Sequence, residues 1–108
     1  MPTASILVVE DEAIISLAIQ SELETLGYCV AGAAFQGEEA LRLVEQNPPD
    51  LVLMDINLQG EIDGIETAQR LQTQHKLPII FLTAAMDDAT LQRTKAVVPY
   101  GYLLKPFE

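Results

Sequence analysis

The sequence has few of the features that mark secreted or membrane proteins. It contains one cysteine, Cys29, so no disulfide can form within the chain. No apolar run approaches the roughly 18 residues that a membrane helix needs, and the first residues lack the charged and apolar regions of a signal peptide. These absences predict a soluble, cytoplasmic protein with no membrane partner. Because Cys29 lies in an apolar stretch, we expect its thiol to be buried.

Positive charge is also scarce. Six lysine and arginine residues stand against 16 aspartate and glutamate residues, which gives a formal net charge of −10. Such a surface repels nucleic acid and anionic membranes, so the composition argues against direct DNA binding by this segment. Hydrophobic residues still make up 49 % of the 108 residues, which is enough for the core of one small domain.

Strand-like and helix-like segments alternate along the whole chain. The expected strands cover residues 5–9, 28–34, 51–54, 77–82 and 101–104. The expected helices cover residues 12–26, 38–46, a segment that Asp63 opens as N-cap, and 88 to about 97. Near-continuous apolar strands indicate a parallel sheet covered on both faces, so the pattern predicts a doubly wound α/β fold. No glycine-rich phosphate loop follows the first strand, which disfavours a dinucleotide-binding fold.

Polar residues follow four of these strands directly. They are Glu10, Asp11, Asp55, Thr83 and Lys105. Because the carboxyl ends of parallel strands meet at one edge of a sheet, we expect these residues to converge there. Three carboxylates in one pocket repel each other unless their pKa values rise or a cation compensates them. Magnesium takes oxygen ligands from carboxylates and phosphates, so the pattern predicts a Mg²⁺ site beside a phosphoryl group.

Each of these residues also has an ordinary explanation when it is taken alone. Asp11 could be a helix N-cap, Thr83 a strand-end cap, and Lys105 a solvated surface residue. A common site is favoured because all five residues directly follow one of four predicted strands.

The chain resembles the receiver domain of two-component response regulators. The matching segments are residues 6–12, 53–55, 63–64, 82–84 and 101–107. The resemblance implies a flavodoxin-like, five-stranded parallel sheet of order 2-1-3-4-5 flanked by five helices. It also implies a function in phosphorelay signal transduction.

The resemblance assigns a role to each matching acidic residue. Asp55 corresponds to the phosphoacceptor, which takes its phosphoryl group from the phosphohistidine of a sensor histidine kinase or of a phosphotransfer protein. Glu10 and Asp11 correspond to the acidic pair that holds Mg²⁺ together with Asp55. Asn57 corresponds to the residue that offers its backbone carbonyl to the metal.

The resemblance assigns three further residues to the phosphorylated state. Thr83 and Lys105 correspond to the hydroxyl and the ammonium that contact the phosphoryl group. Tyr102 corresponds to the aromatic switch residue that turns inward on activation. A partner or output domain, which the sequence does not identify, would respond to this switch.

The chain departs from the family pattern in three places, one of which is Val98-Pro99-Tyr100 in place of the small residues common before the fifth strand. The loop from Asp55 to Asp63 is one residue longer than the common form, and it carries Gln59-Gly60 where a proline is usual. On this resemblance, we expect residues 1–108 to be a receiver domain that stops before the family's fifth helix. We therefore expect either a further helix beyond Glu108 or self-association, such as a homodimer, through the face that this helix would cover.

Two other functions compete with phosphoacceptance. A Mg²⁺-dependent aspartyl phosphohydrolase would want a second aspartate two residues after Asp55, and that position is Asn57. A non-phosphorylated, receiver-like interaction module would have lost Asp55, Asp11 or Lys105, and all three are present. The sequence therefore favours a phosphoacceptor with slow autodephosphorylation over an enzyme.

Overall fold

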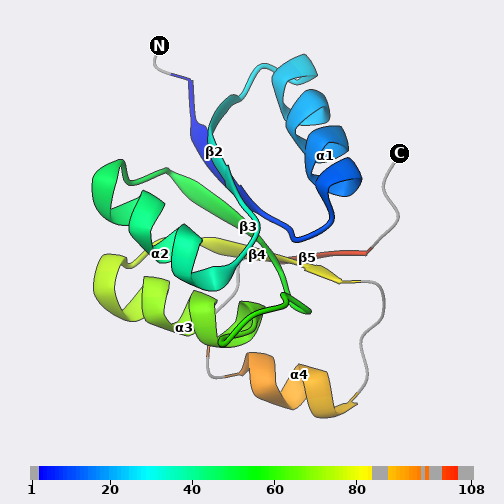
Figure 1. Ribbon diagram of the computed structural model, residues 1–108, viewed down its shortest axis with the longest axis vertical. Helices are drawn as coiled ribbons and strands as arrows, with labels where there is room; N and C mark the ends of the chain where they lie inside the picture. The colour runs from blue at the N-terminus through cyan, green and yellow to red at the C-terminus, as the bar shows by residue number, and fades with distance from the viewer. Residues whose placement is uncertain (1–2, 84–87, 96, 98–100, 105–108) are drawn as a thin grey trace.

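Five parallel strands form one sheet, and helices pack against both of its faces (Figure 1). The computed structural model describes residues 3–83, 88–95, 97 and 101–104, of which 102–104 are described by their backbone alone. The elements are β1 (Ser5–Val9), α1 (Ala13–Thr25), β2 (Cys29–Ala34), α2 (Gly37–Gln46), β3 (Leu51–Asp55), α3 (Gly64–His75), β4 (Ile79–Thr83), α4 (Asp88–Thr94) and β5 (Gly101–Leu104). The strand order is β2-β1-β3-β4-β5, and every neighbouring pair is parallel. This is the predicted flavodoxin-like fold.

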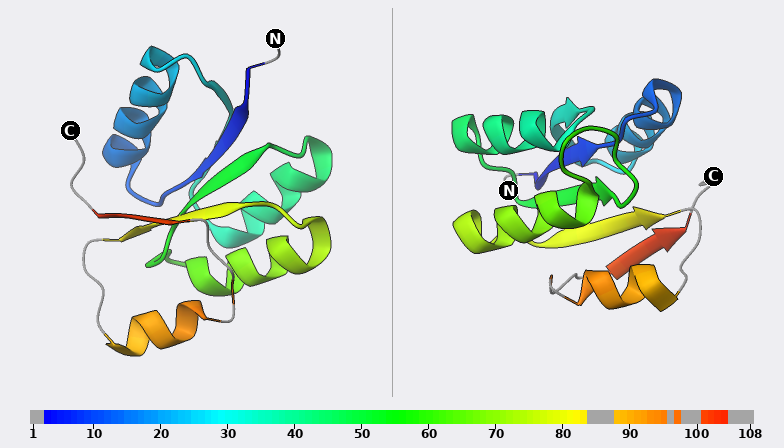
Figure 2. Two further views of the ribbon diagram at one scale, coloured as in Figure 1. Left: turned by 180° about the vertical axis from the view of Figure 1, so that it is seen from behind. Right: turned by 60° about the horizontal axis from the view of Figure 1, so that its bottom comes forward.

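The sheet separates α1 from the other helices (Figure 2). On the side of α2 and α3, a large core cluster includes Phe81 of β4 and Leu71 of α3, both fully buried. On the side of α1, a smaller cluster joins Ile19 to Val8 and Leu82. The strands β1, β3 and β4 bury both of their faces, as their near-continuous apolar sequence predicts. Within the described part of the chain, no helix is long and apolar enough to cross a membrane.

The predicted helix ends are largely confirmed. The Asp63 carboxylate caps α3 by accepting the backbone N–H of Glu66 at 3.0 Å, and Gly27 adopts a positive φ of 94° directly after Leu26, the C-cap of α1. The helical spacing of Ile15, Ala18, Ile19, Leu23 and Leu26 predicts that they form the inner face of α1. This is partly wrong, because Ala18 is exposed, and Leu26 follows the last helical residue and is 64 % exposed. Ser16 is buried in its place. This helix is apolar on several sides, so spacing alone does not identify its buried stripe.

The expectation of a buried Cys29 is also wrong. Cys29 is exposed, because it begins β2, and β2 is the edge strand beside β1. Its neighbour Tyr28 is 44 % exposed. The apolar character of a strand does not reveal whether that strand lies at the edge of the sheet, where one side has no neighbour.

Gly64, the first residue of α3, touches the backbone of β3. A Cβ atom added to Gly64 would lie 1.7 Å from the carbonyl oxygen of Asp55 and 2.7 Å from its carbonyl carbon. The Gly64 N–H donates to the carbonyl of Ile56 at 3.1 Å. The start of α3 is therefore pressed against the end of β3, and only glycine fits there.

We predict that Gly64→Ala destabilises the fold by at least about 2 kcal/mol, because a clash with backbone cannot be relieved by rotating a side chain. Gly32→Ala is the matched control: its Cβ would meet the side chains of Leu7 and Leu43 at 3.6 and 3.7 Å, which is ordinary contact. The control should stay within about 1 kcal/mol of the unchanged protein. Urea unfolding measures both variants, and equal losses would contradict the prediction.

Candidate functional site

The candidate site lies at the carboxyl ends of β1 and β3, where the chain order of the sheet reverses. β1 has β2 on one side and β3 on the other, so this is the topological switch point at which open α/β sheets bind ligands. Glu10 and Asp11 follow β1, and Asp55 is the last residue of β3. One carboxyl oxygen from each of the three lies within 4.8 Å of the others. The structure thus brings together the three carboxylates that the sequence places at strand ends.

Two of these carboxylates are buried, and each is held by a backbone N–H two residues further along. Glu10 is 0 % exposed and Asp55 is 3 % exposed. Glu10 Oε2 accepts the N–H of Glu12 at 3.1 Å, and Asp55 Oδ1 accepts the N–H of Asn57 at 3.0 Å. These hydrogen bonds each satisfy one acceptor site of a buried carboxylate. They also fix the direction of each side chain.

The third carboxylate, that of Asp11, is only half-buried and is held from a distant loop. Asp11 Oδ2 accepts the backbone N–H of Gln59 at 3.1 Å, and 48 positions separate the two residues. The adjacent Gly60 has a φ of 119°, a conformation that side-chain-bearing residues rarely adopt. This contact belongs to the unusually long loop between Asp55 and Asp63, and sequence reasoning did not foresee it.

Two of the three carboxylates, those of Asp11 and Asp55, border an open pocket of about 640 Å³, and the fully buried Glu10 lies behind them. The pocket is lined by Asp11, Glu12, Phe35, Gln36, Asp55, Asn57 and Gln59. Asn57 therefore lies at the wall where the sequence places it. The donor set fits Mg²⁺, because the ion prefers carboxylate and carbonyl oxygens and keeps several waters, for which the pocket has room.

The remaining predicted site residues lie on β4, on β5 and after β5. Thr83 ends β4 and is fully buried. In the sheet, Asp55 pairs with Leu82, so Thr83 lies one position beyond the partner of Asp55. Tyr102 lies on β5 opposite Phe81, but its side chain and all of Lys105 lie outside the described residues.

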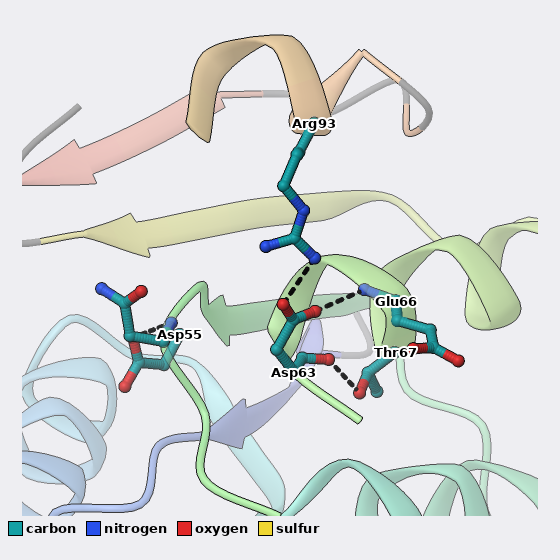
Figure 3. Close-up of polar contacts among 6 residues, drawn as sticks. Asp55, Asp63, Glu66, Thr67 and Arg93 are labelled. Carbon is teal, nitrogen blue, oxygen red and sulfur yellow. Dashed lines mark hydrogen bonds and ion pairs between the residues drawn. The ribbon is translucent and has the colours of Figure 1, made fainter. Parts of the chain in front are cut away.

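A polar network joins the end of the site loop to α4 (Figure 3). Asp63 Oδ1 caps α3 through the N–H of Glu66, while Asp63 Oδ2 pairs with Arg93 of α4 at 2.5 Å. The Thr67 hydroxyl donates to the carbonyl of Asp63 at 2.7 Å. One aspartate thus fixes both the start of α3 and the position of α4. Sequence reasoning predicted the cap but missed the ion pair.

Comparison with known proteins identifies the family. The family model for the response regulator receiver domain matches residues 6–108. The chain belongs to this family, as its fold and its acidic site indicate, and it is the receiver domain of a two-component response regulator.

Two curated relatives illustrate the match. The transcriptional regulatory protein PdtaR of Mycobacterium tuberculosis is 36 % identical over 102 residues, which is 94 % of this chain and 49 % of that protein. AfsQ1 of Streptomyces coelicolor, also named a transcriptional regulatory protein, is 38 % identical over 96 % of this chain and 45 % of its own length. The chain therefore spans about half the length of these relatives.

Solved structures agree with the family assignment. The signal receiver domain of a modulated diguanylate cyclase from Desulfovibrio desulfuricans G20 superposes with a TM-score of 0.93 at 45 % identity, over 99 % of this chain and 85 % of that one. The chemotaxis protein CheY4 of Vibrio cholerae gives a TM-score of 0.89 at 31 % identity, over 99 % and 90 % of the two chains.

We predict that Arg93→Ala loosens α4 and leaves the rest of the domain intact. The pair is partly exposed, so its loss should lower the free energy of unfolding by no more than about 1 kcal/mol. Amide hydrogen exchange in α4 should accelerate, because most residues of this short helix are exposed. Arg70→Ala is the control, since Arg70 pairs only with Glu66 of its own helix among the ion pairs described. Equal acceleration in α4 for both variants would refute the prediction.

Proposed function

We propose that this receiver domain accepts a phosphoryl group on Asp55 in a Mg²⁺-dependent reaction and thereby switches a partner or an output domain. The observation that supports the proposal is the convergence of Glu10, Asp11 and Asp55 within 4.8 Å beside an open pocket. Asp55 is buried at the end of a central strand, yet it lines this pocket. A nucleophile so placed is rigid and can still be reached.

We assign the metal ligands to the carboxylates of Glu10, Asp11 and Asp55 and to the backbone carbonyl of Asn57. Bound there, Mg²⁺ would offset negative charge on the phosphoryl oxygens and on the carboxylates that approach them. The sequence supplies few cations, with six lysine and arginine residues in all. Charge compensation at this acidic site therefore falls to the metal and, in our assignment, to Lys105.

The transfer itself needs little from the protein beyond position and charge. A carboxylate oxygen of Asp55 attacks the phosphorus in line with the bond that breaks. In a phosphohistidine donor, the phosphorus–nitrogen bond breaks and its electron pair stays on the imidazole nitrogen. In our proposal, the Thr83 hydroxyl and the Lys105 ammonium donate hydrogen bonds to the phosphoryl oxygens. Water in the open pocket then hydrolyses the acyl phosphate slowly, so the domain is a timed phosphoacceptor rather than a turnover enzyme.

The donor would dock on α1, next to the pocket. Ile14 is 84 % exposed and Leu17 is 64 % exposed, and they lie one helical turn apart on the solvent side of α1. Ile14 comes two residues after Glu12, which lines the pocket. Exposed apolar side chains beside a reactive site suit a contact with an apolar helix face. We infer that a sensor histidine kinase or a phosphotransfer protein binds here.

The central prediction concerns Asp55. Incubation with acetyl phosphate and MgCl₂ should add one phosphoryl group to the intact protein, as measured by mass spectrometry. Asp55→Asn should abolish the adduct, because the amide is a poor nucleophile, and EDTA should suppress it in the unchanged protein. Asp88→Asn is the control, since Asp88 lies on α4 in an exposed first turn. An adduct that persists in Asp55→Asn would disprove the assignment.

A second prediction separates docking from chemistry. Ile14→Ala should slow phosphotransfer from a purified histidine kinase that phosphorylates the unchanged protein. The expected loss is about tenfold, which corresponds to the truncation of an important interface residue. The reaction with acetyl phosphate should not change, because that donor needs no helix surface. Leu91→Ala, which trims an exposed residue of α4, should leave both rates unchanged. Equal loss with both donors would contradict docking on α1.

A further inference from the structure

Asp11 differs from the other two carboxylates of the site in how its side chain is held. Glu10 and Asp55 each accept an N–H from a residue two positions away, so these hydrogen bonds depend only on the local structure at the ends of β1 and β3. Asp11 accepts its N–H from Gln59, 48 positions away. Its orientation therefore depends on how the loop between β3 and α3 folds.

Asp11 is also the carboxylate with most freedom to leave the site. It is half-buried, whereas Glu10 and Asp55 are enclosed by the ends of the sheet. Repulsion from these two neighbouring carboxylates favours side-chain conformations of Asp11 that point away from them. The Gln59 N–H opposes this repulsion, because it donates to Oδ2 of Asp11 at 3.1 Å and so holds the side chain in place.

The loop is shaped to present this N–H. Gly60 turns the chain with a φ of 119°, and its surroundings are the side chains of Gln36 and Glu38, the nearest of whose atoms would lie 3.7 Å or more from an added Cβ. The Gln59 contact uses Oδ2 of Asp11, so Oδ1 remains for a cation. Partners that orient a metal ligand in this way often account for a large share of metal affinity.

We propose that the backbone N–H of Gln59 is a positioning group that holds Asp11 ready for Mg²⁺, an inference that rests on the proposed function. The Gln59 side chain has no part in it. The inference deepens the proposed metal site by making its affinity depend on the β3–α3 loop.

The test compares two substitutions at one position. Gln59→Pro removes the N–H, while Gln59→Ala removes the side chain and keeps the N–H. Titration of each protein with MgCl₂, followed by ¹H–¹⁵N NMR chemical shifts, gives the dissociation constant without any phosphoryl transfer. We expect Gln59→Pro to bind Mg²⁺ about tenfold more weakly than the unchanged protein, and Gln59→Ala to stay within about twofold of it.

Three results would count against the inference. It is overturned if Gln59→Pro binds Mg²⁺ as tightly as the unchanged protein, or if Gln59→Ala loses as much affinity as Gln59→Pro. Both results leave the proposed function standing. If the unchanged protein binds no Mg²⁺, the proposed function fails first and takes the inference with it.

A second measurement needs neither metal nor proline, and it decides the question if Gln59→Pro does not fold. In EDTA, the amide exchange rate of Gln59 is compared between the unchanged protein and Asp11→Ala. Loss of the carboxylate acceptor should speed exchange at Gln59 about tenfold, while the Asn57 amide, which bonds to Asp55, should keep its rate. An unchanged rate at Gln59 would overturn the inference.

Discussion

Electrostatic repulsion among three carboxylates is the constraint on which the rest of this structure depends. Like charges about 4 Å apart repel by about 1 kcal/mol in water and by about 4 kcal/mol at the lower effective dielectric constant near a protein surface. Here the oxygens lie within 4.8 Å of one another, and Glu10 and Asp55 have almost no contact with solvent. A flexible chain would separate these groups, so a rigid framework must hold them together.

The central strands supply this framework. Val9 and Met54 are fully buried and immediately precede Glu10 and Asp55. The backbone hydrogen bonds continue past the strands, since the Glu10 N–H donates to Ala34 and the Ile56 N–H donates to Leu82. Because Val9 also pairs with Met54 in the parallel ladder between β1 and β3, the ends of these strands cannot move apart without breaking the ladder and opening the core. The apolar strands thus serve the chemistry by holding charges that would otherwise separate.

The parts of this arrangement that local sequence patterns determine could be predicted. Apolar runs predict buried parallel strands, and parallel strands place Glu10, Asp11 and Asp55 at one edge. The Asp63 cap could be predicted as well, because a cap and its target lie three residues apart. The sequence could not reveal that Cys29 is exposed, since that depends on which strand lies at the edge of the sheet.

Contacts between loops and distant elements escaped prediction for a different reason. The Asp63–Arg93 and Asp11–Gln59 pairs join residues 30 and 48 positions apart. No periodicity relates such residues, because they meet only after the sheet has set the positions of the elements between them. The predicted departure of the β3–α3 loop from the family pattern pointed to the right segment. The contact itself uses a backbone N–H, which every residue except proline carries, so residue identity could not mark it.

The β3–α3 loop connects the two ends of the proposed signal. The loop begins after Asp55. At its other end, Gly64 contacts the Asp55 carbonyl, and Asp63 forms an ion pair with Arg93 of α4. If the end of β3 moves, it therefore pushes directly on α3. The Asp63–Arg93 ion pair then transmits the movement to α4. Because α4 is mostly exposed, it resists such a shift less than the packed helices α2 and α3 do. Charge added at Asp55 would then act most strongly on the helix that is held least firmly.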